Sequence, residues 1–267
     1  MIRGLYTSAS GMLAQQANQD VIANNLANVN TASYKKDRAV FQAFPEMLIR
    51  RIADFSPPAP GEIEKNPIIG RLGTGATLDR IWTDTSYTGV RNTDVPTDVA
   101  IVGQGYFVVN TPDGERYTRN GQFKVRPDGT LVTSDGLEVQ GQNGSIVVPS
   151  STSIRIDENG RILNGTQEIA QLRIVGFDEA QASQNLPIEK QGDSLYRPSQ
   201  QNGAGGLQNL PQGQIQIKSG ALELSNVNVV QEMVQMISAT RAYEANQKAI
   251  QAQDGTLEKT CGELGKA

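Results

Sequence analysis

The sequence predicts a discontinuous α+β protein, in which coiled-coil-like helices at the two ends pair and a central domain is rich in antiparallel strands. Three observations predict this fold: a four-three spacing of apolar residues at both ends, frequent turn dipeptides in the middle, and Pro- or Gly-rich segments between these parts. The expected domains are a terminal helical assembly domain of residues 1–30 plus 220–267, a linker or loop region of residues 31–75, and a β domain of residues 76–219.

The N-terminal end is predicted to be helical because residues at alternating steps of four and three form a seam. The seam consists of Leu5, Ala9, Met12, Gln16, Gln19, Ala23 and Leu26. Its two glutamines cost stability, but polar residues at such positions can set the register between partner helices. The helix is expected to fray at its end, because asparagine is a poor helix former. The asparagines there are Asn24, Asn25 and Asn28.

A second seam near the C-terminus repeats this spacing over a longer stretch. It comprises Val229, Met233, Met236, Thr240, Tyr243, Gln247, Ile250, Asp254, Leu257 and Cys261. Ser225 and Asn226 precede it as N-cap candidates. One amphipathic helix at each end could also pack on the core of a single globular domain. Pairing of the two ends is favoured because the middle of the chain is predicted to be β-rich and offers no helical layer to join.

The middle of the chain is marked by Asp-Gly and Asn-Gly dipeptides separated by short runs of alternating polarity. These dipeptides lie at residues 113–114, 120–121, 128–129, 135–136, 143–144, 159–160 and 164–165. Such spacing is typical of antiparallel hairpins and disfavours a parallel β/α fold. The segments SPPAPG (56–61) and GRLGTG (70–75) predict a loop or linker before the β region, and residues 200–214 predict a second loop after it.

The composition argues against several classes of function. The sequence has no histidine, which removes the most common general base and zinc ligand. Its one cysteine, Cys261, cannot form an intrachain disulfide and lacks a histidine that would make it a nucleophile. The 24 basic and 28 acidic residues are mixed along the chain, which disfavours nucleic acid as a partner. The sequence contains no run of about 18 apolar residues, which membrane insertion of a helix would need. The N-terminus lacks the apolar run of a cleaved signal peptide.

Several local patterns resemble sites but lack the spacing that the chemistry needs. Residues 157–168 begin like a calcium-binding loop without its ligand set and turn glycine. Neither Gly103-Gln104-Gly105 nor GRLGTG has the GxxxxGK[ST] spacing of a phosphate loop. Asp94 and Asp98 flank a proline, where carboxylates are typically turn formers, although a hydrolase using both was considered. We therefore predict no catalytic residue, no cofactor and no metal.

Three segments, in order along the chain, carry a family resemblance. Residues 23–31 read ANNLANVNT and are followed by Tyr34-Lys35-Lys36. Residues 98–108 read DVAIVGQGYFV and continue into YTRNG at 117–121. Residues 220–228 read GALELSNVN, with RAYE at 241–244. Together these motifs resemble the bacterial flagellar axial proteins, specifically the basal-body rod proteins. Many members carry Gly-Phe where this chain has Ser33-Tyr34, a change that removes a permissive backbone position.

The resemblance implies a structural, non-enzymatic subunit of the flagellar basal body in the cell envelope. Its terminal helices would form an inner layer around a central export channel, with the β domain outside. The expected partners are copies of itself, other rod and hook proteins, and the flagellar type III export apparatus, which would export the chain without cleaving a signal peptide. Polar seams would leave the ends disordered until neighbouring subunits supply apolar surface.

The residues expected to mediate assembly follow from the two seams and their asparagine-rich boundaries. The seam residues are Leu5, Met12, Leu26, Met233, Met236, Tyr243, Ile250 and Leu257, and the capping or linking residues are Asn24, Asn25, Asn28, Asn226 and Asn228. The stretch from Phe41 to Arg51, interpreted as a short extra helix or an intersubunit loop, favours the proximal-rod branch, with the distal rod next. The alternatives are a flagellar hook or hook-associated subunit, or a secreted β-rich fibre or adhesin subunit.

Overall fold

The computed structural model describes residues 2–50, 68–149, 154–165, 167–176, 188–192, 194–198, 208–209 and 216–264. The chain divides into two compact units. We call residues 1–26, 37–82 and 229–267 the helical unit, and residues 27–36 and 83–228 the β unit. The predicted fold class is confirmed, since a helix lies near each end of the sequence and the middle consists of antiparallel strands.

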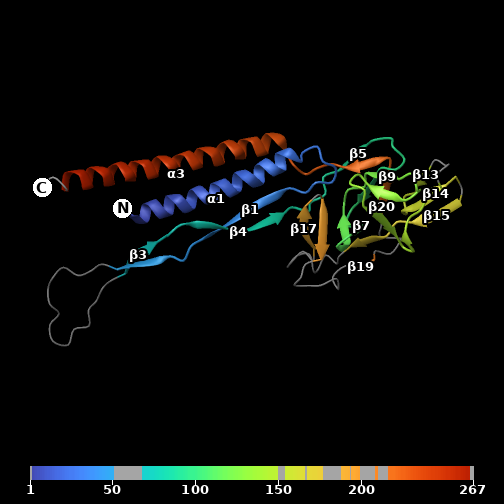
Figure 1. Cartoon of the computed structure of the whole chain (residues 1–267), viewed down its shortest axis with the longest axis horizontal. Helices are drawn as coiled ribbons and strands as arrows, with labels where there is room; N and C mark the ends of the chain where they lie inside the picture. Colours follow the sequence, from blue (N-terminus) through green and yellow to red (C-terminus); the bar gives the residue numbers. More distant parts are fainter. Residues whose placement is uncertain are drawn as a thin grey trace, which may run out of the picture. The chain divides into compact units, whose positions relative to one another are not determined.

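In the helical unit, α1 (Ile2–Ala27) and α3 (Val229–Leu264) lie side by side and run in opposite directions (Figure 1). The antiparallel register is seen in the contacts, because Gly4 lies beside Gln253 while Gln19 Nε2 donates to Thr240 Oγ1 at 3.3 Å. Neither helix, within the described residues, combines the length and the apolar character that a membrane-spanning helix needs.

The helical unit also contains four strands, which we call the β arm. Strand β1 (Asp37–Ala43) pairs with β4 (Ala76–Thr83), and β2 (Met47–Arg50) pairs antiparallel with β3 (Ile68–Leu72). The stretch from 31 to 75, expected to be a linker, therefore contains three strands. Alternating apolar and polar residues there allow the strands to pair. Of the glycines of GRLGTG, Gly70 lies in β3, Gly73 directly follows it and Gly75 directly precedes β4. The SPPAPG segment lies outside the described residues.

The β unit is built from short strands. In chain order they are β5 (Val90–Asn92), β6 (Val99–Val102), β7 (Tyr106–Thr111), β8 (Gly114–Thr118), β9 (Phe123–Val125), β10 (Leu131–Thr133), β11 (Glu138–Gly141), β12 (Gly144–Ser145), β13 (Ile154–Ile156), β14 (Arg161–Asn164), β15 (Gln167–Gln171), β16 (Ile174–Gly176), β17 (Ile188–Gly192), β18 (Leu195–Pro198), β19 (Gln208–Asn209), β20 (Gln216–Ser219) and β21 (Ala221–Glu223).

The largest sheet has the order β17-β18-β8-β7-β11-β10-β9, with β12, β16 and β19 attached to it. Strands β13, β14 and β15 form a second antiparallel sheet, β6 pairs with β20, and β5 pairs with β21. Residues 220–228, expected in the helical domain, thus belong to the β unit, because β21 completes a strand pair there. The predicted loop at 200–214 lies outside the described residues except for β19.

Most of the predicted turn dipeptides connect neighbouring antiparallel strands. In the β7–β8 hairpin, Thr111 pairs with Gly114, whose φ is 110°. Asn120-Gly121 is different, because β8 and β9 are not neighbours in the sheet. A Cβ atom on Gly121 would lie 1.7 Å from Val99 O, so glycine is needed there for close packing of two backbones and not for a hairpin.

The main hydrophobic core lies in the β unit and joins its sheets. Phe107 and Phe123 form an edge-to-face pair with ring centroids 5.1 Å apart, and Ile156, Ile162 and Leu172 pack in the same cluster. A second cluster contains Tyr106 and Tyr196. Side chains that alternate along strands of several sheets thus meet in one interior, which gives the β unit a core of its own.

Candidate functional site

The inner face of the helix pair repeats every seven residues on both helices. It carries Gly4, Gly11, Asn18 and Asn25 on α1, and Glu232, Ala239, Asn246 and Gln253 on α3. A Cβ atom on Gly4 would lie 2.4 Å from Gln253 Nε2, and one on Gly11 would lie 3.1 Å from Asn246 Nδ2. Small residues of α1 therefore make room for polar side chains of α3, which allows the helices to approach closely.

Asn25 joins three elements of the helical unit. Its Nδ2 donates to Asp37 O at 2.8 Å while its Oδ1 accepts from Asp37 N at 2.9 Å, so the amide pairs with the start of β1 as a neighbouring strand would. The same Nδ2 donates to Glu232 Oε2 at 3.3 Å. Asn25 is 1% exposed and Glu232 is 3% exposed, so losing these hydrogen bonds would leave buried polar groups unsatisfied.

Large apolar side chains lie exposed on the outer faces of both helices. The α3 stripe consists of Val230, Met233, Val234 and Ile237, and the α1 pair consists of Tyr6 and Leu13. Residues of the stripe are between 49% and 72% exposed, and both residues of the pair are 68% exposed. Their spacing of three, four and seven residues places each set on one face of its helix.

The β arm adds a second exposed apolar surface to the helical unit. On the β2–β3 hairpin, Met47, Leu48 and Ile69 are 49%, 54% and 64% exposed. On β4, Ile81 and Trp82 are 53% and 42% exposed. Exposed apolar side chains thus occur on both strand pairs of the β arm.

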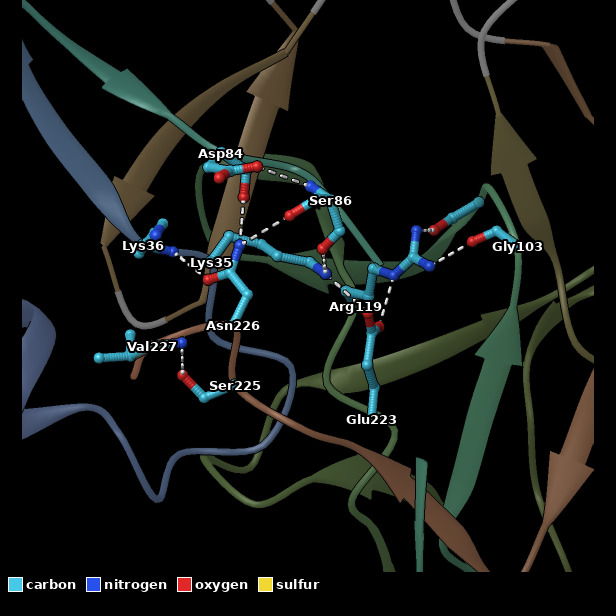
Figure 2. Close-up of polar contacts among 11 residues, drawn as sticks. Lys35, Lys36, Asp84, Ser86, Gly103, Arg119, Glu223, Ser225, Asn226 and Val227 are labelled. Atoms are coloured by element: carbon cyan, nitrogen blue, oxygen red, sulfur yellow. Dashed lines mark hydrogen bonds and ion pairs between the residues drawn. The ribbon is translucent and has the colours of Figure 1, made fainter. Parts of the chain in front are cut away.

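A carboxylate and two cations are buried together in the β unit (Figure 2). Glu223 Oε1 lies 2.6 Å from Lys35 Nζ, and Glu223 Oε2 lies 2.6 Å from Arg119 Nε. The side chains of Lys35 and Glu223 are 0% exposed and that of Arg119 is 5% exposed. Lys35 Nζ also donates to Ser86 O at 2.8 Å. Because one carboxylate balances two buried cations, Glu223 is the member whose loss would cost most.

Burial dominates the ionisation of this cluster. Desolvation lowers the pKa of Lys35 below its usual value, although the Glu223 carboxylate opposes this effect. Desolvation also raises the pKa of Tyr106 to about 12. The Tyr106 ring lies beneath the Arg119 guanidinium, whose carbon is 5.8 Å from the ring centroid. Lysine and tyrosine are therefore shifted in opposite directions by the same cause.

Asn226 fastens neighbouring segments of the β unit (Figure 2). Its Oδ1 accepts from Lys36 N at 2.7 Å, and its Nδ2 donates to Asp84 O at 2.8 Å. Its own N–H donates to Tyr34 O at 3.3 Å, and Asp84 N donates to Lys36 O at 2.9 Å. These residues adjoin points at which the chain passes to the helical unit, so the chain enters and leaves the β unit through segments that are hydrogen-bonded to one another.

Comparison with known proteins decides the family. Three family descriptions match: "Flagella basal body rod protein" at residues 5–35, "Flagellar hook protein FlgE/F/G D1 domain" at 100–164, and "Flagellar basal body rod FlgEFG protein C-terminal" at 218–261. The chain is 37% identical to the flagellar basal-body rod protein FlgG of Bacillus subtilis, over 97% of this chain and 98% of that protein. The chain belongs to the flagellar basal-body rod protein family.

Other relatives cover the chain equally well. The chain is 36% identical to FlgG of Borreliella burgdorferi, over 96% of this chain and 97% of that protein. It is 30% identical to the flagellar hook-basal body complex protein FlhO of Bacillus subtilis, over the full length of both. The family expected from the three sequence motifs is therefore confirmed.

In this rod-family chain, only part of the predicted seam lies on the inner faces of the helices. The half-buried seam residues are Leu5, Met12 and Leu26 on α1, and Met236, Tyr243, Ile250 and Leu257 on α3. Met233 is 49% exposed, and Gln16 and Ala23 are also exposed. The seam was predicted from the spacing of large apolar residues, whereas the closest contacts between the helices join glycines and amide side chains. On α3, Glu232 therefore lies on the inner face in place of Met233.

The predicted asparagines have different roles. Asn25 and Asn226 form the bonds described above, and Thr31 Oγ1 donates to Asn28 Oδ1 at 3.2 Å. Asn24 and Asn228 are exposed. Asn226 is not the N-cap of α3, since Asn228 directly precedes the helix. The other N-cap candidate, Ser225, accepts from Val227 N at 3.3 Å and shapes the turn before the helix.

The patterns rejected as sites also have structural roles. Arg119 Nη1 donates to Gly105 O at 3.1 Å and Nη2 donates to Gly103 O, so the Gly103–Gly105 loop presents acceptors to a cation, whereas a phosphate site needs N–H donors. The backbone N–H of Asp94 donates to Gly220 O, and Gly220 N donates to Asp98 O. Both aspartates thus belong to one turn fastened to the segment before β21.

Sequence reasoning missed the buried ion cluster, although each member lies inside a rod-family motif. Glu223 is flanked by Leu222 and Leu224 in a strand-like run. Lys35 directly follows an aromatic residue of its motif, and Arg119 directly precedes an amide residue of its motif. A charged residue within a run that is otherwise buried was the available signal, because such a residue needs a partner of opposite charge.

Proposed function

We propose that this chain is a structural, non-enzymatic subunit of the flagellar basal-body rod, and that it polymerises through the outer faces of its helical unit. The observation that carries the proposal is the exposed apolar surface of the α3 stripe and the α1 pair. Covering a large aliphatic side chain contributes roughly 1.5 to 3 kcal/mol, so several such residues left in water favour association.

The two outer faces fit a head-to-tail contact. Tyr6 and Leu13 are seven residues apart, as are the ends of the α3 stripe, which corresponds to about 10.5 Å along each helix. We propose that the α1 pair of one copy packs on the α3 stripe of the next. Because the two surfaces differ, two copies in contact still leave one α1 pair and one α3 stripe free for further copies. Such a heterologous contact generates an open helical polymer when the rotation between successive copies does not close a ring.

The β arm supplies the second contact of each subunit. Its exposed apolar residues lie on paired strands, and the Phe41 to Arg51 stretch that was interpreted as a helix or intersubunit loop contributes β2 to this arm, as far as the described residues extend. Two separate contact surfaces on one unit resist bending better than one, which suits a shaft that carries torque.

We propose the distal rod as the position of the chain, in place of the preference for the proximal branch. The relatives named flagellar basal-body rod protein FlgG support a position in the rod. Its partners would be other copies, adjoining rod and hook proteins, and the flagellar type III export apparatus, which would export it without cleavage of a signal peptide. The hook-complex relative FlhO keeps a hook-adjacent position as the second candidate.

Deletion of the gene followed by imaging of purified basal bodies tests this position. A truncated rod without a hook is the expected result, whereas complete loss of the rod would indicate a proximal subunit. An intact rod that lacks only the hook would indicate the hook-adjacent candidate, and normal basal bodies would contradict any role in the rod.

A paired substitution tests the assembly surface. Val230→Ser with Val234→Ser removes half of the α3 stripe without disturbing a buried group, so the purified chain should fold normally yet be lost from basal bodies. Val147→Ser is the matched control, because Val147 is 57% exposed on the β unit. Equal amounts of both variants in basal bodies, measured by immunoblot, would contradict the proposed surface.

A further inference from the structure

A cavity of about 230 Å³ lies where α1, β1 and α3 of the helical unit meet. Its walls include the apolar side chains of Val21 and Ile22, the amides of Asn18 and Gln235, and the carboxylate of Glu232. The volume exceeds what a single water molecule needs. The cavity is thus a mixed site, in which α1 supplies apolar and amide side chains while α3 and β1 supply the carboxylates of Glu232 and Asp37.

Glu232 is a buried carboxylate whose charge has no counterpart in the described part of the chain. It is 3% exposed, and its hydrogen bond there comes from Asn25 Nδ2 at 3.3 Å. Arg38 also lines the cavity, but no ion pair joins it to Glu232, and its guanidinium carbon lies 6.0 Å from the Trp82 ring centroid. Glu223, by contrast, has two cations against it. A buried carboxylate without a cation is costly, so Glu232 is suited to receive one.

The walls favour a basic side chain over a metal ion. Calcium and magnesium take about six or more oxygen ligands, and the described residues contain no group of three acidic, histidine or cysteine side chains placed to hold a metal. A lysine or arginine has an aliphatic stem that packs on apolar residues and a head that donates several hydrogen bonds. Val21 and Ile22 match the stem, while Glu232 and the amide oxygens match the head.

We propose that this cavity binds the ammonium or guanidinium group of a basic side chain from a second copy of this chain. The inference rests on the proposed polymer and names a charged contact within it. The cavity residues Gln231 and Gln235 are exposed on α3, where they adjoin Val230 and Val234 of the α3 stripe. Glu232 lies on the inner face, so a second copy that covers the stripe would reach it past these two glutamines.

The helices themselves supply donors for such a contact. Exposed basic side chains without an ion-pair partner in the described structure are Arg3, Arg241, Lys248 and Lys259. One of these, carried by the neighbouring copy, would complete the charge balance at Glu232. The contact would fix the position of one subunit along the next, which apolar side chains alone do weakly because they are non-directional.

Glu232→Gln is the first test, because the glutamine oxygen still accepts from Asn25 while the charge is lost. We expect the purified chain to keep its helix content and unfolding temperature, and its amount in basal bodies to fall more than about tenfold. Glu244→Gln is the matched control, since Glu244 is exposed on the same helix and should assemble as the unmodified chain does.

A second variant covers the case in which Glu232→Gln fails to fold. Gln235→Arg places a guanidinium three residues from Glu232 on α3, so the chain would fill its own cavity and exclude the neighbour's side chain. This variant should fold at least as well as the unmodified chain and be depleted from basal bodies.

Charge reversal identifies the donor. Glu232→Lys is combined in turn with Arg3→Glu, Arg241→Glu, Lys248→Glu and Lys259→Glu, and one combination should recover assembly that both single variants lose. Normal assembly of Gln235→Arg, or no recovery in any combination, would overturn the cation site. So would a rise in unfolding temperature with millimolar CaCl2 or MgCl2 that Glu232→Gln abolishes, because a metal would then occupy the cavity. Absence of the unmodified chain from basal bodies would instead overturn the polymer role, and with it the named partner.

Discussion

Phe107, Phe123 and Leu131 are fully enclosed in the β unit, whereas Leu13, Val230 and Ile69 of the helical unit are more than half exposed. The buried hydrophobic residues identified in the helical unit are few and small: Ala14, Val21, Ile22 and Ala239. The β unit therefore holds the elements of an independent domain, while the helical unit leaves much of its apolar surface uncovered.

This difference in burial indicates where each unit obtains its stability. Burial within the chain stabilises the β unit, and we expect burial between chains to stabilise the helical unit. The sequence provides separate probes for this comparison. Trp82 is the only tryptophan and lies in the helical unit, whereas Tyr106, Tyr117 and Tyr196 are buried in the β unit. Tryptophan fluorescence thus reports on the helical unit. The tyrosine near-ultraviolet circular dichroism comes mainly from the buried rings of the β unit, because Tyr6 and Tyr243 of the helical unit are less buried.

Removing the charge of Glu223 should have the largest effect of the changes considered, because it should destabilise the β unit, which otherwise folds on its own core. In Glu223→Gln, Lys35 and Arg119 would stay buried without a carboxylate, which we expect to lower the free energy of unfolding by about 3 to 5 kcal/mol. Urea unfolding followed by the tyrosine signal measures this. Glu189→Gln is the control, because the Glu189–Arg197 pair is 43% and 44% exposed and should change stability by less than about 1 kcal/mol.

Alkaline pH should weaken the β unit through Tyr106. Its pKa is raised to about 12, so its stabilising contribution is fully present below pH 10 and is lost as pH rises to about 12. This shift in pKa corresponds to roughly 3 kcal/mol. Unfolding of the unmodified chain and Tyr106→Phe, compared at about pH 9 and about pH 11.5, should show a smaller loss in the variant. The lowered pKa of Lys35 affects both proteins equally, and equal slopes would contradict the assignment.

Asn25→Ala should destabilise the helical unit and leave the β unit unchanged. The substitution removes the bonds to Asp37 and Glu232 and leaves buried groups unsatisfied, so we expect a loss of about 2 kcal/mol in the transition followed by Trp82 fluorescence. The tyrosine transition should stay unchanged. Asn24→Ala is the matched control, since Asn24 is exposed, and an equal loss in both variants would remove the special role of Asn25.

Ser33→Gly should have the smallest effect and should stabilise the β unit. Ser33 has a φ of 58° and a buried hydroxyl without a hydrogen-bond partner in the described structure. Glycine relieves both costs at some expense of chain entropy, for a net gain of about 1 kcal/mol. Ser33→Ala, which removes the hydroxyl but keeps the strained φ, should gain less. Loss of stability in Ser33→Gly would contradict this account.

The fold was largely predictable because its signals are local. Asp113-Gly114 and Asn143-Gly144 specify hairpins through φ values that glycine adopts readily, and both terminal helices show helical spacing. The β arm was missed because β1 and β4 are joined only through a long intervening stretch, so no short turn links them in the sequence.

The candidate site was less predictable because its contacts join distant parts of the chain. Lys35 and Glu223 are 188 residues apart, and nothing in either segment alone indicates the other. The seam of the helix pair was mistaken in part because glycine and asparagine are weak helix formers, and spacing rules based on hydrophobicity overlook them. Asn25 was identified as a linking residue, but its pairing with the backbone of β1 depends on a strand that was not predicted.

The seven-residue repeat of the helix pair has a mechanical consequence. If α1 moved along α3 by one repeat, a step of about 10.5 Å, Gly11 would face Gln253 and Asn25 would face Ala239, so small residues would again lie opposite amides at these positions. Asn25 would then have lost Glu232, and Gln19 would have lost Thr240. Resistance to sliding thus includes two polar contacts toward one end of the pair, which act as the stop that holds a subunit at fixed length under axial load.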